Sequence, residues 1–344
     1  MPSAEPLFVT LFVPGLVPWP QQRWPQVLSG LPSLHRLLSR AKTTQRGVEH
    51  LPALLLSAFG VERQSDWPVA PYTLLADGGD PSEAFWMRAD PVHLLPQQGQ
   101  LVLVDTGPLL LSAQACESLV ESVNSHLAAD GPTLCAPGPQ RWYMRLPREL
   151  RIQTTPPDLA AGRNVDALLP EGGDALLVHR WSNEVQMLLH EHPVNAAREA
   201  RGELPVNSLW LWGAGRLARV PIASARHVWA DETLMRGLAL ASEAPLHLQP
   251  DSAEAWLASA NAGEHWILLD SFAISGGHAQ ARAWEARAQQ LEEAWFAPLL
   301  AALSARRVGE VTLATVHEGR ALSFRVASGD LWKLWRRSVS LARD

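Results

Sequence analysis

Short apolar runs alternate with segments of helical periodicity along most of the chain. Residues 7–13 form an apolar, β-favouring run that ends at Pro14-Gly15, and this pattern predicts a buried first strand. From residue 175 onward strands and helices alternate, which predicts an α/β fold with a doubly wound, mostly parallel sheet covered on both faces. The helices expected outside the middle of the chain span 31–38, 51–59, 183–190, a segment after Pro193, 231–241, 252–260 and 279–305, and the strands span 208–212, 224–229, 245–248, 265–269 and 311–316.

The middle of the chain has a different order of elements. Two strand-like segments precede a helical period and a further strand, which is typical of a small α+β unit. These segments span 84–95, 101–104, 112–128 and 141–146. We therefore expect an inserted α+β domain at 78–175, and a discontinuous α/β core domain formed by 1–77 and 176–344.

The composition is that of a globular protein, with 47% hydrophobic and 19% charged residues among 344. The formal net charge of -6 leaves no basic excess to neutralise phosphates, so no nucleic-acid partner is expected. Only Cys116 and Cys135 occur, outside any Cys-x-x-Cys pair, which argues against a disulfide scaffold or a zinc ribbon. No basic segment precedes the first apolar run and no stretch is long enough to span a bilayer, so we expect a cytoplasmic protein without a membrane span.

Tryptophan is unusually frequent, with fifteen residues against two tyrosines. Many of the tryptophans fall at the ends of expected elements, where a large side chain can anchor a loop to the core. Aromatic stacking of a ligand is one alternative. A tryptophan-rich interface with a protein partner is another, and the sequence leaves both open.

Four stretches, taken in order, resemble the archaeal-type cofactor-independent phosphoglycerate mutases of the alkaline phosphatase superfamily. The first is similar to the superfamily's TPNLDRLAxxG helix, and the second to a strand pair in which an Arg precedes a ligand-facing turn. The third matches the next helix and strand of the inserted unit, and the fourth the return to the main sheet. The stretches read LPSLHRLLSRA, FWMRADPVHLLPQQGQLVLVDTGP, ACESLVESVNSHL with RWYMRLP, and HPVNAARE with NSLWLWGAG.

The resemblance implies an alkaline-phosphatase-like fold with a small inserted domain. The chain looks still closer to the bacterial RpfE-type regulatory proteins, which share the NSLWLWG block at 207–213. This second resemblance implies a regulatory role.

Phosphatase-superfamily catalysis needs two metal ions held by carboxylates and imidazoles, together with a Ser or Thr nucleophile. The first metal ligand would be an Asp directly after the first strand, where this chain has Val13-Pro14-Gly15-Leu16. An Asp-His pair would follow a late strand, where it has Val316-His317-Glu318. Without these carboxylates the charge of two dications is not offset. We therefore expect no metal site and no cofactor, with a divalent metal such as Mn2+ or Mg2+ as the alternative.

Part of a third metal-ligand pair survives. Asp270 and His278 follow an expected strand, although their spacing is longer than the superfamily's Asp-x-x-x-His. If any catalysis remains, Asp270, His278 and His317 are the candidate catalytic residues. Otherwise these side chains line a ligand site or form hydrogen bonds within their loops.

Arg88, Arg141 and Arg145 lie on the expected inserted unit, in segments that resemble the part of the mutases that holds the substrate. A guanidinium fork binds phosphate or carboxylate through two parallel N–H bonds, so these residues are candidates for ligand binding. The alternative is an ion pair on the protein itself, with Asp90 or Asp105 as the partner.

Further candidates lie between residues 190 and 215. His190 and His192 are two positions apart, so on a helix they face different sides; they can cap carbonyls or line a cleft. The glycines at 213–215 follow an expected buried strand, and a turn there could present N–H groups to an anion. The ligand-binding candidates of this segment are His192, Asn195, Arg198, Gly213 and Gly215.

The sequence as a whole predicts a degenerate phosphoglycerate-mutase-like protein without an intact two-metal site. Its predicted role is regulatory and non-catalytic, through binding of a phosphorylated or carboxylated metabolite or of a protein partner. The alternative is an active cofactor-independent phosphomutase or phosphoesterase with a rearranged site. The basic amphipathic segment at 331–342 is expected to pack on its own domain, with a partner or a membrane surface as alternatives.

Overall fold

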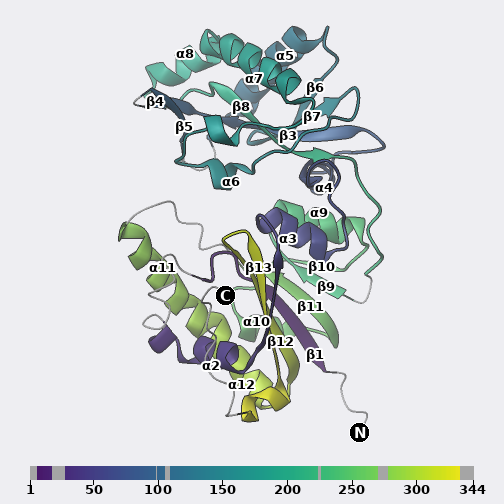
Figure 1. The fold of residues 1–344 in the computed structure, drawn as a ribbon, viewed down its shortest axis with the longest axis vertical. Coiled ribbons are helices and arrows are strands. Elements are labelled where there is room, and N and C mark those ends of the chain that lie inside the picture. Colours follow the sequence, from purple (N-terminus) through teal and green to yellow (C-terminus); the bar gives the residue numbers. More distant parts are fainter. Residues whose placement is uncertain are drawn as a thin grey trace. The chain divides into compact units, whose positions relative to one another are not determined.

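The computed structural model describes residues 6–17, 28–97, 99–104, 109–223, 226–269 and 278–333, with only the backbone of 278–282. Packing divides the chain into two compact units (Figure 1). Unit 1 comprises Met1–Leu55 and Pro221–Asp344, and unit 2 comprises Leu56–Val220. By this division, the boundaries that the sequence predicts at 78 and 175 both fall inside unit 2.

The described part of unit 1 is built on a seven-stranded sheet. In sheet order its strands are β10 (Leu246–His247), β9 (Arg226–Trp229), β11 (Gly263–Leu268), β1 (Leu7–Phe12), β12 (Val308–His317), β13 (Arg320–Ala327) and β2 (Lys42–Gly47). The strands from β10 to β12 run parallel, while β13 and β2 extend the sheet antiparallel. The expected α/β fold with a mostly parallel sheet is therefore confirmed.

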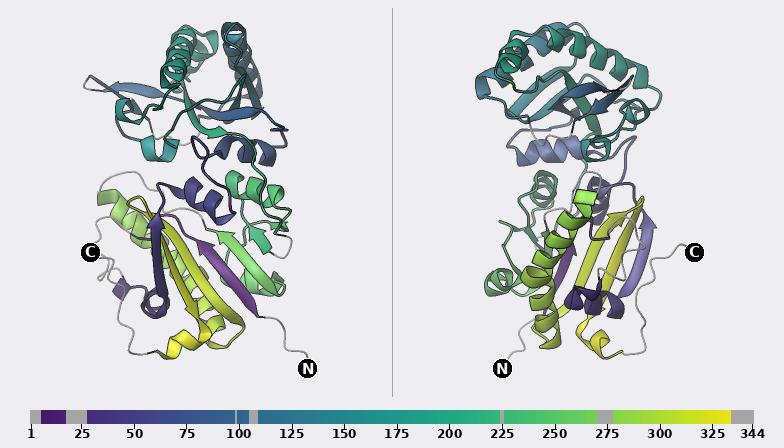
Figure 2. Two further views of the ribbon diagram at one scale, coloured as in Figure 1. Left: turned by 45° about the vertical axis from the view of Figure 1, so that its right-hand side comes forward. Right: turned by 90° about the vertical axis from the view of Figure 1, so that its left-hand side faces the viewer.

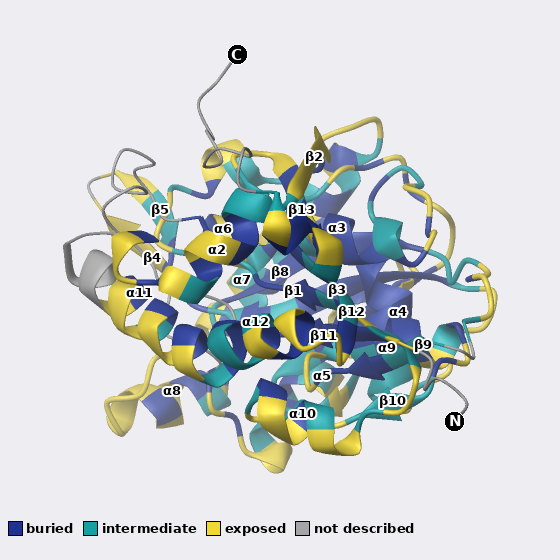
Figure 3. Cartoon of the chain, turned by 90° about the horizontal axis from the view of Figure 1, so that it is seen from below, coloured by how far each residue is buried: buried dark blue, intermediate teal, exposed yellow. Residues whose placement is uncertain are grey.

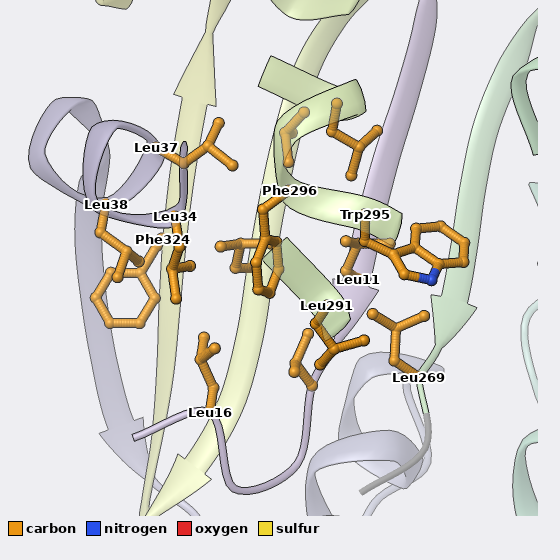
Figure 4. Close-up of a cluster of buried hydrophobic side chains, with 14 of the residues drawn as sticks. Leu11, Leu16, Leu34, Leu37, Leu38, Leu269, Leu291, Trp295, Phe296 and Phe324 are labelled. Carbon is orange, nitrogen blue, oxygen red and sulfur yellow. The ribbon is translucent and has the colours of Figure 1, made fainter. Parts of the chain in front are cut away.

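Helices pack against the face of this sheet that carries Val9, Leu11 and Ile267. The helices of unit 1 are α2 (Pro32–Arg40), α9 (Thr233–Ala241), α10 (Ala253–Ser259), α11 (His278–Leu291), the π-helical turn η3 (Glu292–Phe296), α12 (Ala297–Ser304) and the 3-10 turn η4 (Ser328–Trp332); α3 (Leu51–Ala58) crosses into unit 2. Figure 2 shows the green α11–α12 segment lying along one face of the sheet. Side chains from α2 and η3 interdigitate with those of β1 and β13 in one core (Figure 4).

Unit 2 contains a four-stranded sheet in the order β6 (Thr133–Gly138), β7 (Arg141–Leu146), β3 (Phe85–Val92) and β8 (Ser208–Gly215), and a separate pair, β4 (Leu94–Gln97) and β5 (Gln100–Leu103). Its other elements are α4 (Val69–Ala76), α5 (Ala113–Leu127), α6 (Pro157–Ala160), the 3-10 turn η2 (Asp166–Leu168), α7 (Ala175–His190) and α8 (Pro193–Ala200). One face of the sheet packs on α5 and α7, whose buried side chains recur at helical spacing.

Strand β8 corrects two expectations. The sequence predicts that 207–215 returns to the main sheet, but β8 pairs antiparallel with β3 in the sheet of unit 2. Gly213 and Gly215 belong to this strand rather than to a turn after it, and a register shift between Trp86 and Arg88 of β3 accompanies a φ of 65° at Gly213. Every residue of β8 is buried. A strand buried on both faces has no alternation of apolar and polar residues, so its sequence does not indicate which sheet it joins.

The described tryptophans act mainly as core anchors. Trp142, Trp181 and Trp256 are fully buried, whereas Trp332 is 80% exposed. Figure 3 shows the central strands of the sheet mostly buried, the edge strand β2 exposed, and the outer faces of the helices exposed. Outside Trp332 the described tryptophans are buried or, in the case of Trp67, half-buried, so they form no large exposed patch in this part of the chain. In the same ranges no helix combines the length and apolar character needed to cross a membrane.

Candidate functional site

The carboxyl end of β1 is apolar and closed. The parallel strands of unit 1 all end at one edge of the sheet, where ligands bind in open α/β folds. Directly after β1, Val13 and Leu16 are both fully buried, and the N–H of Val13 donates to the carbonyl of Ala314 at 2.8 Å. Leu16 packs in the same hydrophobic cluster as Leu34 and Phe324 (Figure 4). Hydrocarbon therefore occupies the position at which the resemblance places a first metal-binding carboxylate.

The end of β12 offers two polar side chains. Thr315 is buried, and its hydroxyl has no hydrogen-bond partner among the described residues. His317 lies farther along, where Glu318 and Gly319 turn the chain into β13 with positive φ angles, as in a tight hairpin. Burial lowers the pKa of His317, although Glu318 opposes this shift. His317 is therefore a half-buried hairpin residue that favours its neutral form.

The described donors at this edge do not fit a two-metal site. Asp270 lies outside the described residues, as does the side chain of His278. Within the described ranges no group of three or more His, Cys, Asp or Glu side chains is arranged to hold a metal ion. The ends of β1 and β12 supply hydrocarbon, one hydroxyl and one imidazole, but no pair of carboxylates to offset two dications.

A small polar cavity of about 220 Å3 opens at the ends of β9, β10 and β11. Asp231 follows β9, Gln249 and Asp251 follow β10, and Leu269 follows β11, while Trp295 of η3 closes the opposite side. In the sheet order, the strand that follows β9 in sequence, β10, lies on one side of it, whereas the strand that follows β11, β12, lies on the opposite side. The cavity therefore lies at a topological switch point, where ligands of open α/β sheets commonly bind.

Arg88 of β3 is buried in an internal ion pair. Its guanidinium pairs with the carboxylate of Asp90 and lies 5.1 Å from the ring centroid of Tyr143 and 5.5 Å from that of Trp212. The indole N–H of Trp212 donates to Asp90 at 2.7 Å. Burial would lower the pKa of Arg88, but Asp90 and Tyr143 outweigh this and raise it, so Arg88 stays charged. The ion pair with Asp90 that the sequence leaves open is therefore the one observed.

Arg141 is likewise engaged within unit 2. Its guanidinium donates twice to the carboxylate of Asp77, at 2.8 and 2.6 Å, and the hydroxyl of Tyr143 donates to the same carboxylate at 2.6 Å. Burial would raise the pKa of Asp77, but the hydrogen bonds from Arg141 and Tyr143 outweigh it and lower the pKa. This fork ties β7 to the end of α4.

His192, Asn195 and Arg198 lie together on α8, and each is buried. One imidazole nitrogen of His192 caps the helix, and the other lies 3.0 Å from the hydroxyl of Ser122. Asn195 donates to two backbone carbonyls at 2.7 Å and accepts the N–H of Val206 at 2.9 Å. Arg198 donates to two further carbonyls at 2.8 Å. These contacts hold the corner between α7, α8 and β8.

Gly213 and Gly215 serve close packing in unit 2. The N–H of Gly213 donates to the hydroxyl of Thr154 at 2.8 Å, and that hydroxyl donates to the buried carboxylate of Asp66, whose pKa burial raises. A Cβ at Gly215 would lie only 2.4 Å from the Cβ of Pro68. The glycines are therefore needed for the approach of the backbone to neighbouring side chains.

Arg145 is the sequence-predicted arginine that faces a cavity. It lies exposed on β7, and its side chain makes no hydrogen bond or ion pair with any described residue. The cavity, of about 570 Å3, is also lined by Arg216, whose guanidinium donates to the carbonyl of Glu83 and lies 3.7 Å from the carboxylate of Glu149. Two guanidiniums beside hydroxyl groups suit a phosphate or carboxylate, although Glu83 also lines the cavity and adds one negative charge. The hydroxyl-bearing residues of the lining are Ser82 and Thr133.

The sequence analysis missed Arg216. This residue directly follows the glycines at the end of β8, and a basic residue after a buried strand was the available signal. The other missed lining groups come from 82–85 and 131–133, and only the pairing of β3, β7 and β6 brings them together.

The chain is similar in sequence to 2,3-bisphosphoglycerate-independent phosphoglycerate mutases. A probable enzyme of this kind from Geobacter sulfurreducens is 28% identical over 171 residues, which are 48% of this chain and 42% of that protein. Another from Methanothrix thermoacetophila is 39% identical over 67 residues, 20% of this chain and 17% of that protein. The matches thus span less than half of these relatives. No family model matches the chain.

Two solved structures share its fold over nearly the whole chain. A cofactor-independent phosphoglycerate mutase from Thermoplasma acidophilum superposes with a TM-score of 0.50 at 15% identity, covering 98% of this chain and 94% of that one. A protein from Pyrococcus horikoshii gives a TM-score of 0.55 at 15% identity, covering 94% and 88%. The expected alkaline-phosphatase-like fold is confirmed, and at this identity the likeness is one of fold alone.

Proposed function

We propose that this chain is a phosphoglycerate-mutase-like protein that binds a small phosphorylated or carboxylated molecule and does not carry out two-metal phosphoryl transfer. The ligand site is the cavity of unit 2, where Arg145 and Arg216 hold the anionic group. The protein is regulatory, and the bound state is read by a protein partner, in keeping with the resemblance to RpfE-type regulatory proteins.

The observation that carries this proposal is the burial of Val13 and Leu16 at the end of β1. A metal ligand at this position would need a carboxylate facing an open edge of the sheet. In this structure a carboxylate at position 13 or 16 would be buried among leucines and a phenylalanine. Its desolvation would cost several kcal/mol unless a metal or another cation paired with it. The apolar packing at the end of β1 therefore supports a protein that lacks the first metal-binding carboxylate.

The free guanidinium of Arg145 supports the choice of site. A charge-assisted hydrogen bond contributes about 1.5–3 kcal/mol, so two arginines acting on one anion support binding in the millimolar range or tighter. Arg88 and Arg141 already neutralise Asp90 and Asp77, so an added anion would have to displace a carboxylate from either of them. Arg145 has no such competitor.

A thermal-shift measurement on metal-stripped protein tests the proposal, with millimolar 3-phosphoglycerate and inorganic phosphate as probes. We expect stabilisation of the wild type that grows with ligand concentration. Arg145→Ala should remove the shift, whereas Arg219→Ala, which deletes an exposed arginine of the same unit outside the cavity lining, should keep it. An equal shift in all three proteins would overturn the site, and no shift in any of them would overturn the ligand class.

The alternative, an active phosphomutase or phosphoesterase with a rearranged site, makes a different prediction. Turnover of 3-phosphoglycerate would then depend on added Mn2+ or Mg2+ and on His317. An assay of the wild type beside His317→Ala, with and without metal, separates the two. Metal-dependent turnover lost in His317→Ala would favour the enzyme over the binding protein.

A further inference from the structure

A cluster of three histidines lies on the parallel strands at one end of the sheet of unit 1. His227 of β9, His265 of β11 and His247 of β10 stand on adjacent strands. The rings of His227 and His265 stack with centroids 4.9 Å apart, and His247 stacks on Trp229 at 4.2 Å. This cluster is separate from the cavity of unit 2 that holds Arg145.

His265 is a fixed neutral member of the cluster. It is fully buried, and its Nε2 lies 2.7 Å from the carbonyl oxygen of Asn261, so this nitrogen carries the proton. Its Nδ1 accepts the indole N–H groups of Trp229 and Trp256, at 3.1 and 3.3 Å. Both nitrogens of His265 are therefore engaged, and its ring provides a fixed surface on which the ring of His227 stacks.

His227 and His247 share a single hydrogen bond. The Nδ1 of His227 lies 3.0 Å from the Nε2 of His247, and a bond between two imidazoles needs one nitrogen with a proton and one without. Both rings are half-buried. If each ring takes up a proton, the lone pair disappears and two positive charges face each other at this distance.

Among the described residues, no carboxylate pairs with His227 or His247 to compensate that charge. Arg226 and Glu264 pair with each other at 3.1 Å, and strand alternation directs them to the opposite face from His227 and His265. Helix α9 carries Arg236 and Glu232, whose carboxylate caps its own helix. Around these elements the remaining described acidic residues are Glu254 on α10 and Asp231, Glu243 and Asp251 in the loops, and none of the four pairs with His227 or His247.

The pair joins a very short strand to the sheet. Strand β10 has two residues and lies at the edge of the described sheet. Among its backbone bonds to β9, the N–H of Val228 donates to the carbonyl of Pro245 at 2.8 Å and the N–H of Ala230 to that of His247 at 3.2 Å. The residues that follow β10, Gln249 to Asp251, form one wall of the cavity at the strand ends.

We propose that the His227–His247 pair is an acid-sensitive latch, which holds β10 and the adjoining cavity wall against β9 at neutral pH and releases them on acidification. The latch closes with one shared proton and opens when both imidazoles are charged. Opening exposes the edge of β9 and moves Gln249 to Asp251 away from Asp231, so the small cavity exists in its closed form only above the transition.

The sign of the pH effect follows from the surroundings of the histidines. Burial lowers the pKa of His247, and the neighbouring His227 lowers it further. Burial also lowers the pKa of His265. The open strand therefore binds protons more readily than the closed one, so the closed state keeps its full stability above about pH 6.5 and loses it as the pH falls below that value.

Amide hydrogen exchange of the full chain tests the latch, with rates corrected for the intrinsic effect of pH. Protection of Val228 and Ala230 should fall by about tenfold or more between pH 7.5 and 5.5, since each extra proton changes the opening equilibrium about tenfold per pH unit. The amide of Leu269, which donates to Phe12 in the same sheet, should keep its protection. Unchanged protection of Val228 and Ala230, or an equal loss at Leu269, would overturn the latch.

A matched variant makes the test specific. His247→Gln keeps a hydrogen-bonding group but cannot titrate, so its exchange at Val228 and Ala230 should not depend on pH. His35→Gln, which changes an exposed histidine on α2, should behave like the wild type. A pH-dependent loss of protection in His247→Gln equal to that of the wild type would contradict the proposal. If the variant does not fold, the wild-type comparison with Leu269 still decides.

Discussion

The carboxylate of Glu292 accepts the backbone N–H of Ser33 at 2.6 Å, and its other oxygen accepts the N–H of Leu34 at 3.0 Å. Helix α2 has no side-chain cap of its own and no acidic residue in its first turn. Glu292 is buried and opens the π-helical turn η3. A residue far along the chain thus supplies the negative charge that the start of α2 favours.

Replacing Glu292 should destabilise unit 1. Glu292→Ala leaves two buried N–H groups without an acceptor, so the free energy of unfolding should fall by about 1–3 kcal/mol. Glu292→Gln keeps one acceptor oxygen and should cost less. Urea denaturation followed by tryptophan fluorescence measures both. The exposed neighbour Glu293→Gln is the control, expected to change stability by no more than about 0.5 kcal/mol. Equal effects at 292 and 293 would refute the capping role.

Asp77 should control the acid stability of unit 2. Its pKa is lowered by Arg141 and Tyr143 against the effect of burial, so the ionised carboxylate stabilises the folded state above the usual carboxyl pKa of about 3.9. That stability is lost as the pH falls through the lowered pKa. Asp77→Asn should cost about 1–3 kcal/mol at pH 7 and flatten the pH dependence below 4.

Urea unfolding between pH 3 and pH 7 measures the contribution of Asp77. Tyr143→Phe, which removes one of its hydrogen bonds and no charge, should cost about 1 kcal/mol and keep the pH dependence. A pH dependence of stability that persists unchanged in Asp77→Asn would contradict this account.

The glycines of β8 should prove structural rather than ligand-binding. A Cβ at Gly215 would meet both Cβ and Cα of Pro68, at 2.4 and 2.9 Å, so Gly215→Ala should lower stability by about 1–3 kcal/mol or more through overpacking. Gly47→Ala on β2 meets nothing within 4 Å and should be close to neutral. Thermal unfolding compares the two. Normal stability of Gly215→Ala with lost ligand binding would instead support an anion-binding role.

The pattern of apolar and polar residues along the sequence predicts much of the fold. The run at 7–13 became β1 and the run at 141–146 became β7, because both combine apolar side chains with clear ends. Strand β2 reads KTTQRG and is exposed throughout, so it carries no alternation of apolar and polar residues. Helix α4 contains Pro71 near its start, where the missing N–H costs nothing, and its proline-rich sequence instead indicates a turn.

The candidate site was only partly predictable, because side-chain partners are distant in sequence. Arg88, Arg141 and Arg145 are equivalent as sequence patterns, and only the placement of Asp90 and Asp77 distinguishes the paired arginines from the free one. Likewise His227 and His247 carry no spacing signal, since strand order alone makes them neighbours. In contrast, the sequence shows directly that no carboxylate follows the first strand, and the burial of Val13 and Leu16 agrees with this.

We propose that this protein binds an anionic ligand without metal. Isothermal titration of the chelator-treated wild type with 3-phosphoglycerate tests it most directly. The account predicts saturable binding of one ligand per chain, lost in Arg145→Ala and unchanged when Mn2+ is added. Binding that occurs only after Mn2+ is added, and that survives in Arg145→Ala, would contradict it and point to the carboxyl edge of the sheet in unit 1.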